Sequence, residues 1–275
     1  MITETLLTVV WIGYAAIFGL LIGSFLNVCI YRLPAKITIV KGHSFCPNCK
    51  HPLNTFDLFP VFSYLLLGRK CRYCREPISS RYMKVELLTG VYFAIAAWFL
   101  RPGQVSLPNW LTSTPGADFE ASLILTLAAG LAFSTLLVWA MIIWDQNAVP
   151  NGLFVFAVIP TIIRLAMQPQ LILTHVFALL VSLLLAFALM LLKLMPESTN
   201  RELLQNGIGL GLIALMSGLI TSAAIFVVVL IELLVVKALA DQDNPTIARH
   251  IGHLRRSVPL QVLIIGSVLQ LIFQV

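Results

Sequence analysis

Four cysteines form the pattern with the most chemical content in this 275-residue sequence. They make two Cys-x-x-Cys pairs separated by 21 residues, namely Cys46, Cys49, Cys71 and Cys74. Each pair can turn two thiolates toward one point, and two pairs complete the tetrahedral all-sulfur site that structural zinc prefers. Such a closed site leaves no coordination position for a substrate, so we expect it to fold a loop and not to catalyse a reaction.

Two other chemistries of the cysteine pairs compete with zinc. Disulfides need an oxidising compartment, whereas the charge pattern described below assigns this loop to the cytoplasm. A redox Cys-x-x-Cys normally accompanies a βαβ pattern, and neither pair has one nearby. His43 and His51 flank the first pair, and either could replace a cysteine as a ligand. The fifth cysteine, Cys29, is expected to be a small core residue of a helix.

The elements that must position this loop are apolar helices. The chain is 59% hydrophobic and 11% charged, with a mean hydropathy of +0.93. A soluble domain carries about 25% charged residues, so the composition excludes an ordinary cytosolic enzyme, a disulfide-rich secreted scaffold and a disordered chain. It predicts an all-α polytopic membrane protein with about eight spans of roughly 20 residues each. The expected spans cover 5–31, 84–100, 121–144, 151–167, 171–193, two within 207–240 that divide near Gly218 to Ser222, and 258–274.

The positive charges predict how these spans are oriented. Ten of the 18 lysines and arginines lie between Arg32 and Lys84, so this segment is expected in the cytoplasm and the N-terminus outside. The first helix begins with Glu4 and lacks a basic leader, which favours a retained span over a cleaved signal peptide. The net charge of +6 is attributed to topology and to anionic lipid at the cytoplasmic face, with no nucleic-acid partner. The expected division is a first helix (1–32), a zinc loop (33–83) and a helical core (84–275).

Short motifs surround the cysteine pairs in a fixed order. They read GSFLNVCIYRLP (23–34), PVFSYLLLG (60–68), ISSRY (78–82) and ELLT (86–89). In this combination the sequence resembles the N-terminal region of the bacterial type IV prepilin leader peptidase and N-methyltransferase family, over about residues 19–90. The resemblance implies an inner-membrane protein of eight helices with a cytoplasmic zinc loop after the first.

The resemblance also implies an activity. Family members remove the basic leader from prepilins and type II secretion pseudopilins, and many then methylate the new N-terminal amine with S-adenosylmethionine. No motif in this chain identifies residues that would bind that cofactor. The peptidase chemistry needs two aspartates, one to take a proton from water and the other to donate one.

The positions that the resemblance assigns to these aspartates hold other residues. One aspartate of the family lies seven residues before the proline of an Ile/Leu-Pro-Asp/Asn turn, and the other ends a Gly-x-Gly-Asp motif. Here the turn contains Pro150, the first position is Ile143, and the second is Leu210. Neither side chain can exchange a proton, so we expect a family member with impaired peptidase activity, acting on pilin-like substrates or on an active paralogue.

Two alternatives stay open at this point. One is an active membrane aspartic endopeptidase with a relocated dyad that includes Asp145, its partner being one of Glu202, Glu232, Asp241 and Asp243. For Glu232 an ion pair with Arg164 is the structural alternative. The other is a methyltransferase that has lost the peptidase activity. Glu86 is expected to anchor the loop through Arg81 or Lys84.

Overall fold

The computed structural model describes residues 2–103, 117–145, 147–191 and 227, and in this part of the chain the only regular elements are helices. The long helices are α1 (Ile2–Arg32), α3 (Ser80–Phe99), α4 (Ala117–Trp144), α5 (Asn151–Met167) and α6 (Ile172–Leu191). The short ones are η1 (Thr55–Leu58), α2 (Phe62–Leu66) and η2 (Pro169–Leu171).

The apolar helices agree with a membrane protein. Glu4–Arg32 and Asp118–Trp144 are each long and apolar enough to cross a bilayer, and the apolar segments Asn151–Met167 and Ile172–Val181 are shorter. The helical fold class is thus confirmed for the described residues. The spans expected in 207–240 and 258–274 lie outside those residues, so the total of eight stays a prediction.

The helix ends follow from local sequence. Helix α3 begins four residues before the expected span because Ser79 caps it, its hydroxyl accepting a hydrogen bond from the amide of Arg81 at 3.3 Å. Helix α5 ends at Met167, directly before the predicted stop at Gln168 and Pro169. Proline cannot continue the hydrogen-bond ladder of the preceding helix, so the chain restarts as η2 and α6.

Helices α1 and α3 cross closely because glycines line their contact. A Cβ atom added at Gly19 would lie 2.7 Å from Cβ of Phe93, and one added at Gly23 would lie 2.6 Å from Cα of Glu86. Small residues at such a crossing let two helix backbones approach within van der Waals distance, the usual way to join helices inside a membrane. Near the other end of the crossing the indole of Trp11 donates to the carbonyl of Ala97 at 3.0 Å.

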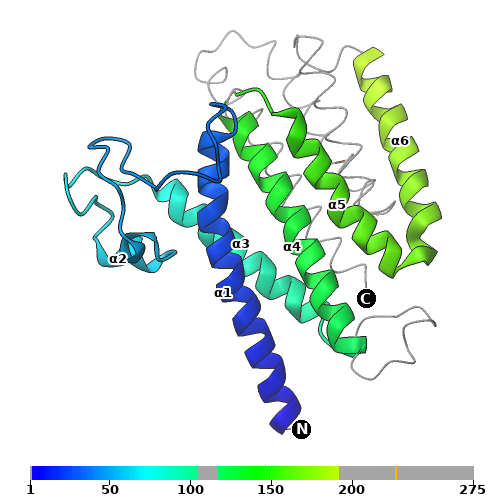
Figure 1. Cartoon of the computed structure of the whole chain (residues 1–275). Helices are drawn as coiled ribbons and strands as arrows, with labels where there is room; N and C mark the ends of the chain where they lie inside the picture. The colour runs from blue at the N-terminus through cyan, green and yellow to red at the C-terminus, as the bar shows by residue number, and fades with distance from the viewer. Residues whose placement is uncertain (1, 104–116, 146, 192–226, 228–275) are drawn as a thin grey trace.

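Helix α4 is the central element of the described core. Phe133, Leu137 and Ile142 on α4 are at most 2% exposed. The ring of Phe133 stacks on Tyr92 of α3 with centroids 4.0 Å apart. Figure 1 shows α4 between α3 and α5, with α1 crossing in front of α3. The cysteine loop and α2 lie on the far side of α1 from α4 to α6 (Figure 1).

Candidate functional site

The two Cys-x-x-Cys segments fold into the same turn, 25 positions apart in the sequence. In each, the amide of the first cysteine donates to the carbonyl five residues later (3.0 and 2.9 Å), and its own carbonyl accepts from the amide four residues later (2.9 and 3.1 Å). The residue after the second cysteine, Lys50 or Arg75, has a positive φ of 58° or 63°. This left-handed residue bends the backbone around the sulfur atoms, so the turn is duplicated in structure as well as in spacing.

The two turns bring all four expected ligands together. The Sγ atoms of Cys46, Cys49, Cys71 and Cys74 lie within 4.8 Å of one another, and those of Cys46 and Cys74 are 3.9 Å apart. Tetrahedral Zn–S bonds of about 2.3 Å place sulfur atoms about 3.8 Å apart, whereas a disulfide requires about 2.05 Å. All five cysteines are free thiols in this structure. The cluster can therefore hold a metal ion such as zinc with little rearrangement.

The thiols of the cluster differ in acidity. The backbone amide of Cys74 donates to the thiol of Cys71, burial opposes this effect, and the amide of Tyr73 reinforces it, so the pKa of Cys71 falls to about 7. At Cys49 the amide of His51 acts to lower the pKa, but burial of the sulfur and hydrogen bonds from the neighbouring thiols of Cys46 and Cys74 outweigh it and raise the pKa to about 11. One thiolate thus forms readily, and several together need a cation to offset their charge.

The other residues considered as ligands lie apart from the cluster. The ring of His51 stacks on Tyr73 with centroids 3.6 Å apart, and its Nδ1 lies 2.7 Å from the carbonyl oxygen of Pro52. His43 contributes its backbone carbonyl to Arg32. Cys29 is 6% exposed within the apolar core, as expected for a packing residue. Among the described residues, the four cysteines are the only group of side chains placed so that they could share a metal ion.

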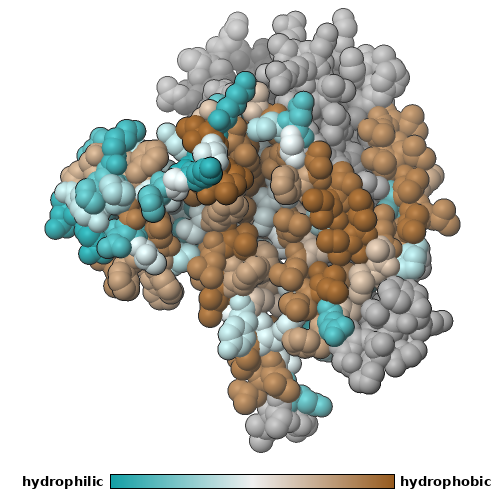
Figure 2. Space-filling model, in the orientation of Figure 1, coloured by the Kyte–Doolittle hydropathy of each residue, from teal (hydrophilic) through white to brown (hydrophobic). Residues whose placement is uncertain are grey.

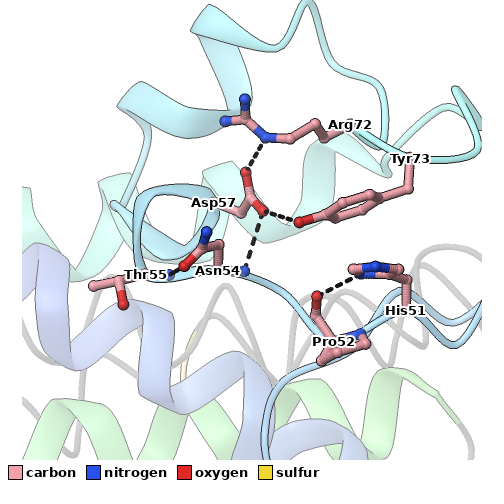
Figure 3. A network of polar contacts seen from close by, with 7 residues as sticks. All are labelled: His51, Pro52, Asn54, Thr55, Asp57, Arg72 and Tyr73. Carbon is pink, nitrogen blue, oxygen red and sulfur yellow. Dashed lines mark hydrogen bonds and ion pairs between the residues drawn. The ribbon is translucent and has the colours of Figure 1, made fainter.

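A polar network centred on Asp57 joins η1 to the second turn, and the stack of His51 on Tyr73 connects it to the first (Figure 3). Its carboxylate, whose side chain is 2% exposed, accepts from Nε of Arg72 at 2.7 Å, from the amide of Asn54 at 3.1 Å and from the hydroxyl of Tyr73 at 3.5 Å. Asn54 and Asp57 form a capping box at the start of η1. The sequence reading overlooked Asp57, although the Asn-x-x-Asp spacing before a turn is a recognisable capping signal.

Two further contacts attach the loop to the helices. Arg32, at the end of α1, is 6% exposed, and its guanidinium donates to the backbone carbonyls of Thr38, Lys41 and His43 at 3.0 to 3.1 Å. Glu86 in the first turns of α3 accepts a hydrogen bond from the amide of Val61 at 2.8 Å. The expectation that Glu86 anchors the loop was right, but its expected partners, Arg81 and Lys84, were wrong. The partner of Glu86 is instead the backbone amide of Val61, a residue whose φ is positive at 62°.

Arg81 instead binds the candidate catalytic residue Asp145. Its two terminal nitrogens donate to the two carboxylate oxygens at 2.6 and 2.7 Å, with both side chains about one-third exposed. This bidentate pair joins the start of α3 to the residue after α4. Ile143, at the position where the resemblance expects an aspartate, packs against the apolar core. Leu210 and the acids considered as partners, Glu202, Glu232, Asp241 and Asp243, lie outside the described residues.

Comparison with known proteins supports the motif reading. A model of the bacterial peptidase A24 N-terminal domain matches residues 17–100, which include the end of α1, the cysteine loop and α3. Proteins named prepilin leader peptidase/N-methyltransferase are similar as well. The one from Neisseria gonorrhoeae is 40% identical over 108 residues, that from Klebsiella pneumoniae 34% over 152, and that from Myxococcus xanthus 49% over 77. No solved structure matches the chain.

These matches cover only part of this chain and only part of each relative. They cover 30%, 50% and 28% of this chain, and 38%, 63% and 23% of the three relatives in the same order. The chain thus spans less than two thirds of the relatives it matches. The region that the family model matches contains all four clustered cysteines and Arg81. Through this N-terminal region, the chain is similar to the prepilin leader peptidase/N-methyltransferase family.

Proposed function

We propose that this chain is a multi-pass protein of the bacterial inner membrane that keeps the family's scaffold and has an impaired peptidase centre. The apolar helices and the family match support the membrane assignment. The excess of lysine and arginine between residues 32 and 84 supports a cytoplasmic loop and an N-terminus on the outer side. The three expected parts, 1–32, 33–83 and 84–275, are kept in this proposal.

The metal is proposed to be zinc in a structural role. The Sγ spacing fits a tetrahedral all-sulfur site, and four cysteine ligands leave no open position for substrate or water. The residues that would hold it are Cys46, Cys49, Cys71 and Cys74. When bound, zinc would offset the thiolate charges and couple its binding free energy to the folding of the loop.

The observation that carries the impaired-peptidase proposal is the ion pair of Asp145 with Arg81. An aspartic dyad shares protons between two carboxyl groups and a water molecule. In this structure both oxygens of Asp145 accept hydrogen bonds from one guanidinium, at 2.6 and 2.7 Å. Such bidentate pairing fixes the carboxylate geometrically and suits an anchor between helices. The aliphatic side chains of Ile143 and Leu210 cannot supply a proton in its place.

The partners follow from the names of the relatives. A prepilin or pseudopilin is the proposed ligand of the scaffold, and an active family paralogue is the alternative partner. Anionic lipid at the cytoplasmic face is a further proposed partner, based on the net charge of +6. S-adenosylmethionine would be required if a methyltransferase activity is present, and it would donate the methyl group to the substrate's N-terminal amine.

A processing assay tests the proposal. Membranes containing the chain are incubated with a prepilin, and intact mass reports loss of the leader or a gain of about 14 daltons for methylation. We expect no leader loss with wild type or Asp145→Asn, under conditions where a relative with both aspartates cleaves fully. Cleavage by wild type that disappears in Asp145→Asn would establish the relocated dyad instead. A mass gain on a pre-cleaved pilin would identify a surviving methyltransferase.

A further inference from the structure

The segment between the two Cys-x-x-Cys turns exposes large apolar side chains. Phe56 and Leu66 are 80% and 84% exposed, and Phe59, Phe62 and Leu65 are each more than half exposed. The rings of Phe59 and Phe62 contact each other with centroids 5.7 Å apart. We call these five residues the apolar ridge. Apolar residues exposed in such a group usually mark a contact with a membrane or with another protein.

The ridge is held in its exposed position by contacts on the opposite side of the segment. Tyr64 of α2 is 8% exposed, so this side of the helix is packed against the protein. Asp57 closes the capping box of η1 and binds Arg72 of the second turn. Val61, with a positive φ, donates its amide to Glu86 of α3. The ridge is therefore a formed surface whose geometry is tied to the start of α3.

The position of the ridge relative to α1 follows from α2, which carries Phe62, Leu65 and Leu66. In Figure 1, α2 lies on the side of the loop that faces the N-terminal end of α1. In Figure 2 this side of the loop is coloured as apolar, whereas its outer side is hydrophilic. If α1 crosses the bilayer and Arg32 marks its cytoplasmic end, the apolar side of the loop points into the leaflet beside it.

Exposed basic residues lie close to the ridge in sequence. Arg69 and Lys70 follow Leu66 after two intervening residues, and Lys50 of the first turn lies over the ring of Phe45 at 5.4 Å. The acid nearest the ridge in sequence, Asp57, is buried in its pair with Arg72. Aromatic side chains with lysine or arginine beside them are the combination that settles at the interface of an anionic membrane. The same positive charge disfavours the basic leader of a prepilin as the occupant.

We propose that the apolar ridge inserts into the headgroup region of the anionic cytoplasmic leaflet, with Arg69 and Lys70 on the lipid phosphates. The loop would then be bound to the membrane surface, and this contact would fix the distance of the cysteine cluster from the bilayer. This inference rests on the proposed membrane placement and is independent of peptidase or methyltransferase activity.

Site-specific photo-crosslinking in nanodiscs tests the contact on the full chain. The photoreactive residue p-benzoylphenylalanine is placed at Leu66 on the ridge, at the exposed Glu76 of the second turn, or at Tyr14 within α1, which is 71% exposed. The bilayer contains phosphatidylglycerol and phosphatidylcholine in equal amounts, and intact mass identifies each lipid adduct. Because both leaflets of a nanodisc have the same composition, the result does not depend on orientation.

We expect lipid adducts at Leu66 and Tyr14 and at least tenfold fewer at Glu76. At Leu66 the phosphatidylglycerol adduct should exceed the phosphatidylcholine adduct by about 25-fold, since each of the two basic residues near an anionic surface contributes about fivefold. Arg69→Gln with Lys70→Gln should bring that ratio close to one while the adducts at Tyr14 stay unchanged.

Three outcomes would overturn the inference. Adducts at Tyr14 with none at Leu66 would show that the membrane placement holds and the ridge does not touch lipid. An absence of adducts at both sites would reject the membrane placement of α1 together with the inference. A Leu66 adduct to an added prepilin peptide, formed in preference to lipid, would assign the ridge to substrate.

Discussion

Replacing Asp57 with asparagine removes the charge at the centre of the network that joins η1 to the second turn. The carboxylate is buried and accepts hydrogen bonds from Arg72, Asn54 and Tyr73, with the Arg72 bond the shortest at 2.7 Å. The amide side chain of the variant would keep one carbonyl oxygen but lose the charge that attracts the guanidinium. The second turn would then separate from η1 more often, and each separation would expose a metal ion held by the four cysteines.

The size of the effect follows from the contacts. A hydrogen bond to a charged group contributes about 1.5–3 kcal/mol. The side chain of Arg72 is 50% exposed, so water replaces part of the lost interaction and we take the lower end, about 1.5 kcal/mol. That free energy corresponds to roughly a tenfold increase in the population of the opened loop.

The assay follows the release of zinc from the full chain to a chromogenic chelator. Asp57→Asn should release zinc about tenfold faster than wild type, in line with the opening free energy above. The matched control is Glu76→Gln, which removes an equal charge from an exposed position in the same loop and should leave the rate within about twofold. Equal rates for Asp57→Asn and wild type would refute the role assigned to this network.

The pH dependence of this effect has a definite sign. Burial acts to raise the pKa of Asp57, but hydrogen bonds from Arg72 and from the amide of Asn54 outweigh it, so the pKa lies below its ordinary value. A carboxylate with a lowered folded pKa stabilises the fold above its unfolded pKa of about 3.9 and loses that contribution only as pH falls through the folded value. The rate ratio of mutant to wild type should therefore stay constant from about pH 5 to 8. A ratio that declines across this range would contradict the assigned ionisation.

Three further predictions concern the metal, the helix crossing and the ion pair. Cys71→Ser should lower the zinc content measured by elemental analysis, and unchanged zinc would refute the four-cysteine site. Gly23→Ala should lower the melting temperature in detergent, because overpacking costs about 1–3 kcal/mol, whereas Gly13→Ala, which meets nothing within 4 Å, should not; equal behaviour would contradict the close crossing. A double-mutant cycle of Arg81→Met and Asp145→Asn should give a coupling free energy of about 0.5–1 kcal/mol, near the upper end for partly exposed ion pairs. A coupling of zero would contradict the anchoring role of this pair.

The sequence predicted the cluster of four cysteines well because its signal is local. Two Cys-x-x-Cys pairs specify two turns, and the structure adds that the turns are duplicated down to the left-handed residues Lys50 and Arg75. The helices were predictable for the same reason, since long apolar runs have few alternatives in a membrane. The stop at Pro169 was identified from one proline between polar residues.

The contacts between distant segments could not be predicted from residue types. Arg81 and Asp145 are 64 positions apart and meet only because α3 and α4 pack side by side. Glu86 had two lysine or arginine neighbours in sequence, yet it binds a backbone amide 25 residues away. Such pairings depend on the helix crossing, and the glycines at that crossing indicate closeness without specifying register.

The most direct test of the account measures the mass of a prepilin after incubation with membranes that contain the wild-type chain. We expect an unchanged leader, because Ile143 and Leu210 stand where the resemblance expects the two aspartates, and Asp145 is held by Arg81. An active relative in matched membranes must remove the leader completely in the same time. Leader removal by the wild-type chain would contradict the central claim that this family scaffold has an impaired peptidase centre.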